Sequence, residues 1–205
     1  PLNHNKLCPD CQQNPPPYRR CIAAFEYQKG AIDKLILDIK TNPHSPEATQ
    51  LSNLLSDVIS LAYQDSAMPT IMIPVPLHWR KLLMRGFNQS TNIASSLSRK
   101  LNNTVILDNT CLRRASSSPQ HLKSRSERLR GMRNAFRMRN NIDDESDIKA
   151  NRTNNPIRGN SVAIVDDVVT SGATAGSLAS TLIKADAKHV DIWCIAKTGW
   201  HIMSD

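Results

Sequence analysis

Long apolar runs are missing from this sequence of 205 residues. A membrane-spanning helix needs roughly 18 or more consecutive apolar residues, and no run approaches that length, so we expect no membrane insertion. The first residues, PLNHNKLC, lack the charged and then apolar pattern of a signal peptide. The five cysteines are too scattered for a disulfide framework and are expected to be reduced thiols. These absences predict a cytoplasmic protein.

Two common phosphate-binding motifs are absent as well. The sequence contains neither the G-x-x-x-x-G-K-[ST] spacing of a P-loop nor the G-x-G-x-x-G of a dinucleotide-binding fold. It also shows no internal repeat. The length fits one main domain with appendages better than two full domains.

Positive charge is in excess and unevenly placed. The net charge is +8, from 26 basic and 18 acidic residues. Between positions 113 and 139 there are nine basic residues and one acid, Glu127. The nine are Arg113, Arg114, Lys123, Arg125, Arg128, Arg130, Arg133, Arg137 and Arg139. This stretch is either a solvated basic face or a surface that contacts phosphate or nucleic acid.

The order of apolar segments predicts an α/β fold. Segments typical of buried strands alternate with segments of helical periodicity, which indicates a parallel sheet with helices on both faces. The expected strands are 21–27, 70–76, 104–107, 162–165 and 189–196, and the expected helices begin near 31, 46, 90 and 174. We divide the chain into a Cys-containing module with a Pro-rich linker (1–20) and a main domain (21–205), with an exposed, mobile loop at about 139–160.

The stretch SVAIVDDVVTSGATAGSL is the strongest candidate site. We expect 162–165 to be a buried strand, so that Asp166 and Asp167 emerge at its carboxyl end, where ligands bind in such sheets. The following turn, 170–174, combines a glycine with three hydroxyls before a helix and can bind an anion through free N–H groups. Carboxylates for sugar hydroxyls beside a phosphate cradle describe a ribose 5-phosphate site. The alternative is a core strand followed by an Asp-rich turn and a Thr-capped helix.

Three segments resemble one protein family. VAIVDDVVTSGAT resembles the PRPP-binding motif of type I phosphoribosyltransferases. IPVPLHWRKLLMRGFNQS, LRRASSSPQHLKSRSERLRGMRNAF and that motif occur in the order seen in the ComF family, in its GntX-like branch, which is associated with competence and DNA utilisation. The resemblance implies a type I phosphoribosyltransferase-like sheet, preceded here by a short remnant of a zinc-finger-like module.

The resemblance also assigns roles to residues. Asp166 and Asp167 form the catalytic pair that holds the ribose 2- and 3-hydroxyls. The 5-phosphate is bound by Thr170, Ser171, Gly172, Ala173 and Thr174. Positive charge for pyrophosphate comes from the loop after Val75, with Arg80, Lys81 and Arg85, and from the basic stretch, with Arg125 and Arg128. The implied reaction displaces pyrophosphate from PRPP by a nitrogen acceptor, with Mg²⁺ held mainly by substrate oxygens. A homodimer is a further implied partner.

Several alternatives remain open from the residues. The fold could serve as a scaffold for a non-catalytic factor in DNA uptake that binds single-stranded DNA. Cys8, Cys11 and Cys21 are candidate zinc ligands, against the favoured interpretation of a finger remnant that lacks its other ligands. Thr170 stands where purine-salvage relatives often place an acidic base, so no base catalysis is expected from this loop. For Trp79 the alternatives are stacking on a base and packing of its loop onto the body; packing is favoured, and no functional role is assigned to Trp79.

Overall fold

One parallel sheet carries the fold. The computed structural model describes residues 15–27, 31–42, 45–101, 105–106, 110–113, 135–139 and 155–198. Within these ranges, five strands form a sheet of order β1-β7-β6-β2-β3, with every neighbouring pair parallel. The strands are β1 (Cys21–Glu26), β2 (Ile71–Pro74), β3 (Val105–Ile106), β6 (Ser161–Val169) and β7 (His189–Lys197). The expected α/β fold is confirmed.

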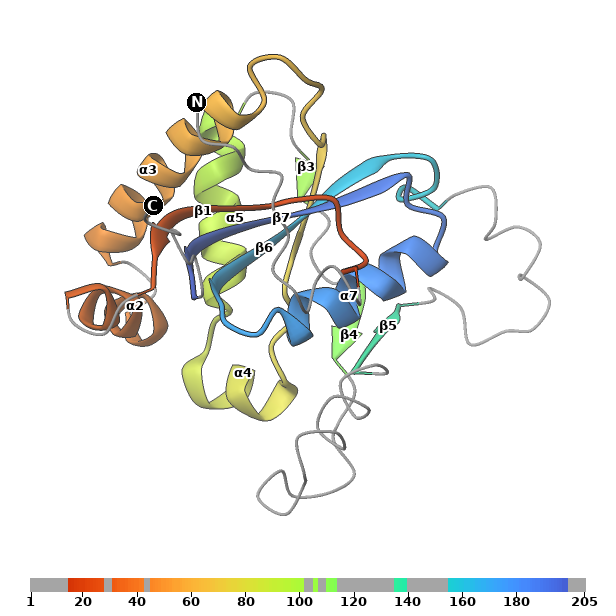
Figure 1. Cartoon of the computed structure of the whole chain (residues 1–205). Helices are drawn as coiled ribbons and strands as arrows, with labels where there is room; N and C mark the ends of the chain where they lie inside the picture. The colour runs from red at the N-terminus through yellow and green to blue at the C-terminus, as the bar shows by residue number, and fades with distance from the viewer. Residues whose placement is uncertain are drawn as a thin grey trace.

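Helices cover both faces of this sheet (Figure 1). One face packs against α2 (Ala31–Thr41), α3 (Pro46–Ala62) and α5 (Gln89–Lys100), and the other packs against α7 (Ala173–Lys184). Because side chains alternate along a strand, β6 contributes Ala163 and Val165 to the first core and Val162 and Ile164 to the second. The central strand is therefore buried on both sides, as its continuous apolar sequence predicts.

The start of α3 follows from its sequence. The Ser45 hydroxyl accepts a hydrogen bond from the Ala48 N–H at 3.3 Å, and Pro46 occupies the first helical position, where its missing N–H costs nothing. None of the helices in the described ranges combines the length and the hydropathy of a membrane span.

A second, antiparallel sheet was not expected. It pairs β4 (Cys111–Arg113) with β5 (Phe136–Met138), which packs against α7. Strands of three residues are too short for a periodic signal. The pairing places Arg113 opposite Phe136, so the two ends of the basic stretch lie side by side. Arg125 and Arg128, between these ends, lie outside the described residues.

Two expected boundaries are wrong. The strand expected at 162–165 continues through Val169, because β6 stays paired with β7 along its whole length. Asp166 and Asp167 therefore belong to the last, paired part of the strand and do not follow it. The exposed loop was expected to extend from 139 to 160, but its last residues pack onto the body. Ile157 is fully buried, and the Asn155 side-chain amide donates to the Ala185 carbonyl at 3.0 Å.

Candidate functional site

The acid pair lies near the carboxyl end of the central strand. Asp166 and Asp167 are both buried, with exposed fractions of 8% and 5%. Successive strand residues start from opposite faces of the sheet, but at the end of β6 the two carboxylates lie close together, and a side-chain hydrogen bond with Asp167 is one of the causes that raise the pKa of Asp166. Their other partners differ.

Asp166 is held by two donors. Its Oδ1 accepts hydrogen bonds from the Ser90 hydroxyl at 3.2 Å and from the Asp167 N–H at 3.0 Å. Burial, followed by the neighbouring charge of Asp167, raises the pKa of Asp166 well above its usual value. Asp166 therefore keeps a proton to higher pH than an exposed aspartate does, and this reduces repulsion within the pair.

Asp167 pairs with a lysine that sequence reasoning missed. Lys40, in the last turn of α2, places its Nζ 3.0 Å from Asp167 Oδ2. This contact is an ion pair without hydrogen-bond geometry, since the same oxygen is buried and accepts no hydrogen bond from the described residues. Nothing in the local sequence distinguishes Lys40 from Lys34 on the same helix. Only the packing of α2 beside the carboxyl end of β6 reveals its role.

The predicted phosphate loop (170–174) connects β6 to α7. Thr170, Ser171 and Gly172 form the turn, while Ala173 and Thr174 already belong to the first turn of the helix. Gly172 has φ 69°, a left-handed conformation, and a Cβ placed there would lie 3.2 Å from the Tyr18 hydroxyl. A side chain would thus be both strained and crowded at this position. The loop and Asp166 line a hollow of about 30 Å³.

The segment after Val75 contains a helix where we expected only a loop. α4 (Trp79–Arg85) begins at His78, whose Nδ1 accepts from the Arg80 N–H at 3.3 Å, and ends at Gly86, which has φ 77°. It lies at the lower left of Figure 1, below the layered body. Its seven residues include none that is buried, so hydrophobic periodicity could not predict it.

The residues after α4 fix the loop to the sheet. Asn88 caps α5 by accepting from the Ser90 N–H at 3.1 Å, and its side-chain amide donates to the Val75 carbonyl at 3.0 Å. Arg85 donates to the Gln89 side chain at 3.2 Å. The segment RGFNQS thus ends one helix, begins the next and holds Arg85 beside the site.

One cleft of about 210 Å³ joins these parts. It contains both aspartates, Thr174 and four basic side chains. The four are Lys40, Lys81, Arg85 and Arg113, and the remaining lining residues are Val75, Pro76, Leu77, Gln89 and Ser90. Asp166 and Thr174 line both the smaller hollow and the cleft, so the two adjoin each other at these residues. Arg80 is not among the lining residues, and its guanidinium lies 5.2 Å from the centre of the Trp79 ring.

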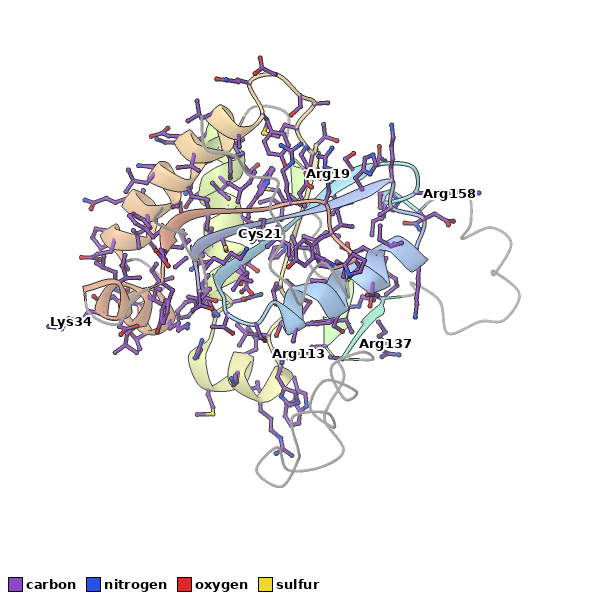
Figure 2. The ribbon with its side chains drawn as sticks, viewed as in Figure 1. Arg19, Cys21, Lys34, Arg113, Arg137 and Arg158 are labelled. Carbon is purple, nitrogen blue, oxygen red and sulfur yellow. The ribbon has the colours of Figure 1, made fainter. Side chains whose placement is uncertain are left out.

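Arg113 is a further cation of the cleft, expected from the sequence only as a member of the basic stretch. It belongs to β4, on the side of the molecule where α4 lies (Figure 2). Burial lowers the pKa of Arg113, and the negative charge of Asp166 acts against that shift. Its guanidinium also lies 5.7 Å from the centre of the Phe136 ring. The antiparallel pair β4–β5 therefore positions this charge at the cleft.

Of the three candidate zinc ligands, the structure describes Cys21 alone. Cys21 lies in β1, where its sulfur is 4.0 Å from that of Cys194 in β7. Cys8 and Cys11 lie outside the described residues, so a zinc site stays a prediction. In the described part of the chain no three His, Cys, Asp or Glu side chains cluster as a metal site would require.

The fold has the arrangement of one class of protein. A parallel sheet with helices on both faces and an acid pair near the end of its central strand is a type I phosphoribosyltransferase-like fold. A hypoxanthine phosphoribosyltransferase from Staphylococcus aureus aligns with 77% of this chain and 68% of its own, at 10% identity and a TM-score of 0.37.

Sequence relatives identify the family, although no protein-family model matches the chain. DNA utilization protein YhgH of Shigella flexneri is 33% identical over 201 residues, which is 97% of this chain and 81% of the relative. Competence protein F of Haemophilus influenzae is 28% identical over 153 residues, 72% of this chain and 61% of the relative. The chain belongs to the ComF family, as the sequence motifs predicted.

Proposed function

We propose that this protein binds PRPP, or a related ribose 5-phosphate, and acts in DNA utilisation as a phosphoribosyltransferase-like protein. The observation that carries the proposal is that the hollow at the phosphate loop adjoins the cationic cleft, with Asp166 and Thr174 lining both. A ligand with a phosphate at one end, hydroxyls in the middle and a second anionic group at the other end matches this order of groups. The names of the sequence relatives support the role in DNA utilisation.

Each part of the ligand has a matching part of the site. The N–H groups at the start of α7 bind the 5-phosphate, because the helix N-terminus leaves donors unpaired and carries partial positive charge. Asp166 and Asp167 accept hydrogen bonds from the ribose hydroxyls. Lys81 and Arg85 face the pyrophosphate and offset the charge that grows on it as it leaves.

The proposed chemistry is transfer of the phosphoribosyl group to a nitrogen nucleophile. The bond between ribose C1 and pyrophosphate breaks, a bond from C1 to the nitrogen forms, and the proton of the nucleophile goes to solvent or to the leaving group. The protein contributes position and charge to this reaction. Magnesium would enter with the pyrophosphate oxygens. Thr170 offers a hydroxyl and no carboxylate, so the phosphate loop supplies no general base.

Calorimetric titration with PRPP tests the binding step. We expect one saturable site per chain and a raised unfolding temperature, because a ligand that binds only the folded state stabilises it. Ribose lacking phosphate serves as the control ligand and should not bind measurably. Absence of PRPP binding, both with and without Mg²⁺, would overturn the proposal.

A second candidate function is binding of single-stranded DNA, and Trp79 favours it. The expectation that this ring packs onto the body is wrong, because 51% of Trp79 is exposed. His78 stacks on it, with ring centres 5.9 Å apart and planes at 28°, and Arg80 lies over it. An exposed ring between basic groups is a suitable platform for a nucleobase, and the neighbouring Lys81 and Arg85 can contact phosphates.

We expect Trp79→Ala to weaken binding of a thymidine oligonucleotide about tenfold, since stacking of a base on an aromatic ring contributes roughly 1–3 kcal/mol. Fluorescence anisotropy at several salt concentrations measures the loss, and the salt dependence should stay, because the phosphate contacts remain. Leu83→Ala on the same helix is the matched control, with 76% of that side chain exposed. Equal effects of the two substitutions would contradict a stacking role.

A further inference from the structure

We propose that the chain itself neutralises the acid pair, through Lys40 and Arg113, so that the cleft binds a ribose 5-phosphate group without a divalent cation. The inference rests on the proposed function, because it concerns the same ligand. It assigns positioning roles to two residues that lie far from the sequence motif of the site.

The position of Lys40 follows from the packing of α2. Ile36 and Ile39 are buried with exposed fractions of 4% and 1%, and Ile39 belongs to the core between the sheet and α3. This fixes the end of α2 at the carboxyl ends of the strands, so that Lys40 reaches Asp167 at 3.0 Å. Lys40 itself is 30% exposed, which leaves its ammonium group partly hydrated.

Asp167 depends on this lysine. Its Oδ2 is buried and accepts no hydrogen bond from the described residues, so Lys40 supplies the charge that compensates it. Leaving a buried carboxylate without a partner costs several kcal/mol. A divalent cation that approached this oxygen would meet the lysine ammonium group and would have to displace it.

Arg113 lies in the same cleft as Asp166, whose negative charge opposes the lowering of the Arg113 pKa by burial. It comes from β4, on the α7 side of the sheet, whereas Lys40 comes from α2 on the opposite side. Both cations line the same cleft as the two aspartates. Asp167 thus has an ion pair with Lys40, and Arg113 adds a second positive charge to the cleft that holds Asp166. These charges come from two elements that are far apart in the sequence.

Charge compensation leaves the acids able to bind a sugar. A carboxylate offers about four lone-pair positions on two oxygens, so the ion pair with Lys40 leaves Asp167 able to accept a hydrogen bond from a ribose hydroxyl. The ribose hydroxyls are neutral, so their binding to the acid pair needs no metal ion. We therefore expect Mg²⁺ to be needed for binding the pyrophosphate of PRPP, and not for binding ribose 5-phosphate.

The test is calorimetric titration with ribose 5-phosphate in EDTA and in Mg²⁺, using the wild type, Lys40→Met and Lys34→Met. For the wild type we expect the two dissociation constants to agree within about twofold. Lys40→Met should bind at least about tenfold more weakly in EDTA, because Asp167 then lacks the charge that compensates its buried carboxylate, and should recover in Mg²⁺, which can supply that charge. Lys34 is the matched control: it points from α2 into solvent (Figure 2) and should have no effect.

The outcomes separate this inference from the proposed function. Wild-type binding that requires Mg²⁺, or Lys40→Met behaving like Lys34→Met, overturns the inference and leaves the proposed function intact. A loss in Lys40→Met that Mg²⁺ does not restore assigns Lys40 to direct ligand contact and also overturns it. No binding of ribose 5-phosphate or PRPP under any condition overturns both. Should Lys40→Met not fold, Lys40→Arg keeps the charge and is expected to bind in EDTA like the wild type.

Discussion

Replacing Asp166 and Asp167 together by asparagine is expected to weaken PRPP binding at least about 100-fold. Each hydrogen bond from a ribose hydroxyl to a carboxylate contributes roughly 1.5–3 kcal/mol, so losing two charged acceptors exceeds the 2.7 or so kcal/mol that correspond to 100-fold. Asparagine has the same shape as aspartate, so packing is kept and the measured loss of binding reports the loss of charge. Calorimetry with PRPP measures the change.

The double substitution should leave the fold intact. Two buried carboxylates become neutral amides, which removes the cost of keeping charges out of water. Lys40 loses its partner but is already partly hydrated, so its unpaired charge can turn to solvent. We therefore expect an unfolding temperature equal to that of the wild type or higher. Asp57→Asn combined with Asp186→Asn is the control, since both of these acids are exposed. Affinity within about threefold of the wild type would show that the acid pair does not bind the sugar.

The main sheet and the phosphate motif could be predicted because both depend on residues that are close in sequence. Continuous apolar segments mark β6 and β7 as strands buried on both faces, and helical periodicity marks α3, α5 and α7. The length of β6 could not be predicted. Aspartate has a low strand propensity, yet pairing with β7 holds the strand together through Asp166 and Asp167.

The cationic side of the cleft could be predicted only in part. Lys81 and Arg85 adjoin a recognisable motif, and the structure places both in the cleft. Lys40 and Arg113 reach it through tertiary packing, which a local pattern does not record. The orientation of α4 was equally hidden, because its leucines and methionine are exposed and give no core-facing stripe. Arg80 consequently lies against Trp79, outside the cleft.

The segment before β1 is fixed to the body by a buried charge. Asp191 in β7 is fully buried and accepts hydrogen bonds from Arg19, with Nε to Oδ1 at 3.0 Å and Nη2 to Oδ2 at 2.6 Å. The Tyr63 hydroxyl donates to the same carboxylate at 2.5 Å and accepts from Trp193 Nε1 at 3.3 Å. Burial and this carboxylate together raise the pKa of Tyr63, so the phenol stays a donor. Arg19 lies at the edge of the sheet beside β1 (Figure 2).

Asp191→Ala is expected to lower the free energy of unfolding by about 3–5 kcal/mol, because removing one partner leaves the others without their buried counter-charge. Chemical denaturation measures this loss, and Asp57→Ala, on the exposed side of α3, should change stability by less than about 0.5 kcal/mol.

The loss of Asp191 should also affect the phosphate loop. Arg19 follows Tyr18, whose hydroxyl lies beside Gly172 of the phosphate loop, so releasing Arg19 removes a support of that loop. Asp191→Asn keeps acceptor capacity for part of the network and should lose less stability than Asp191→Ala. Equal losses in the two variants would mean that packing around Asp191, and not its hydrogen-bonded charge, fixes the segment.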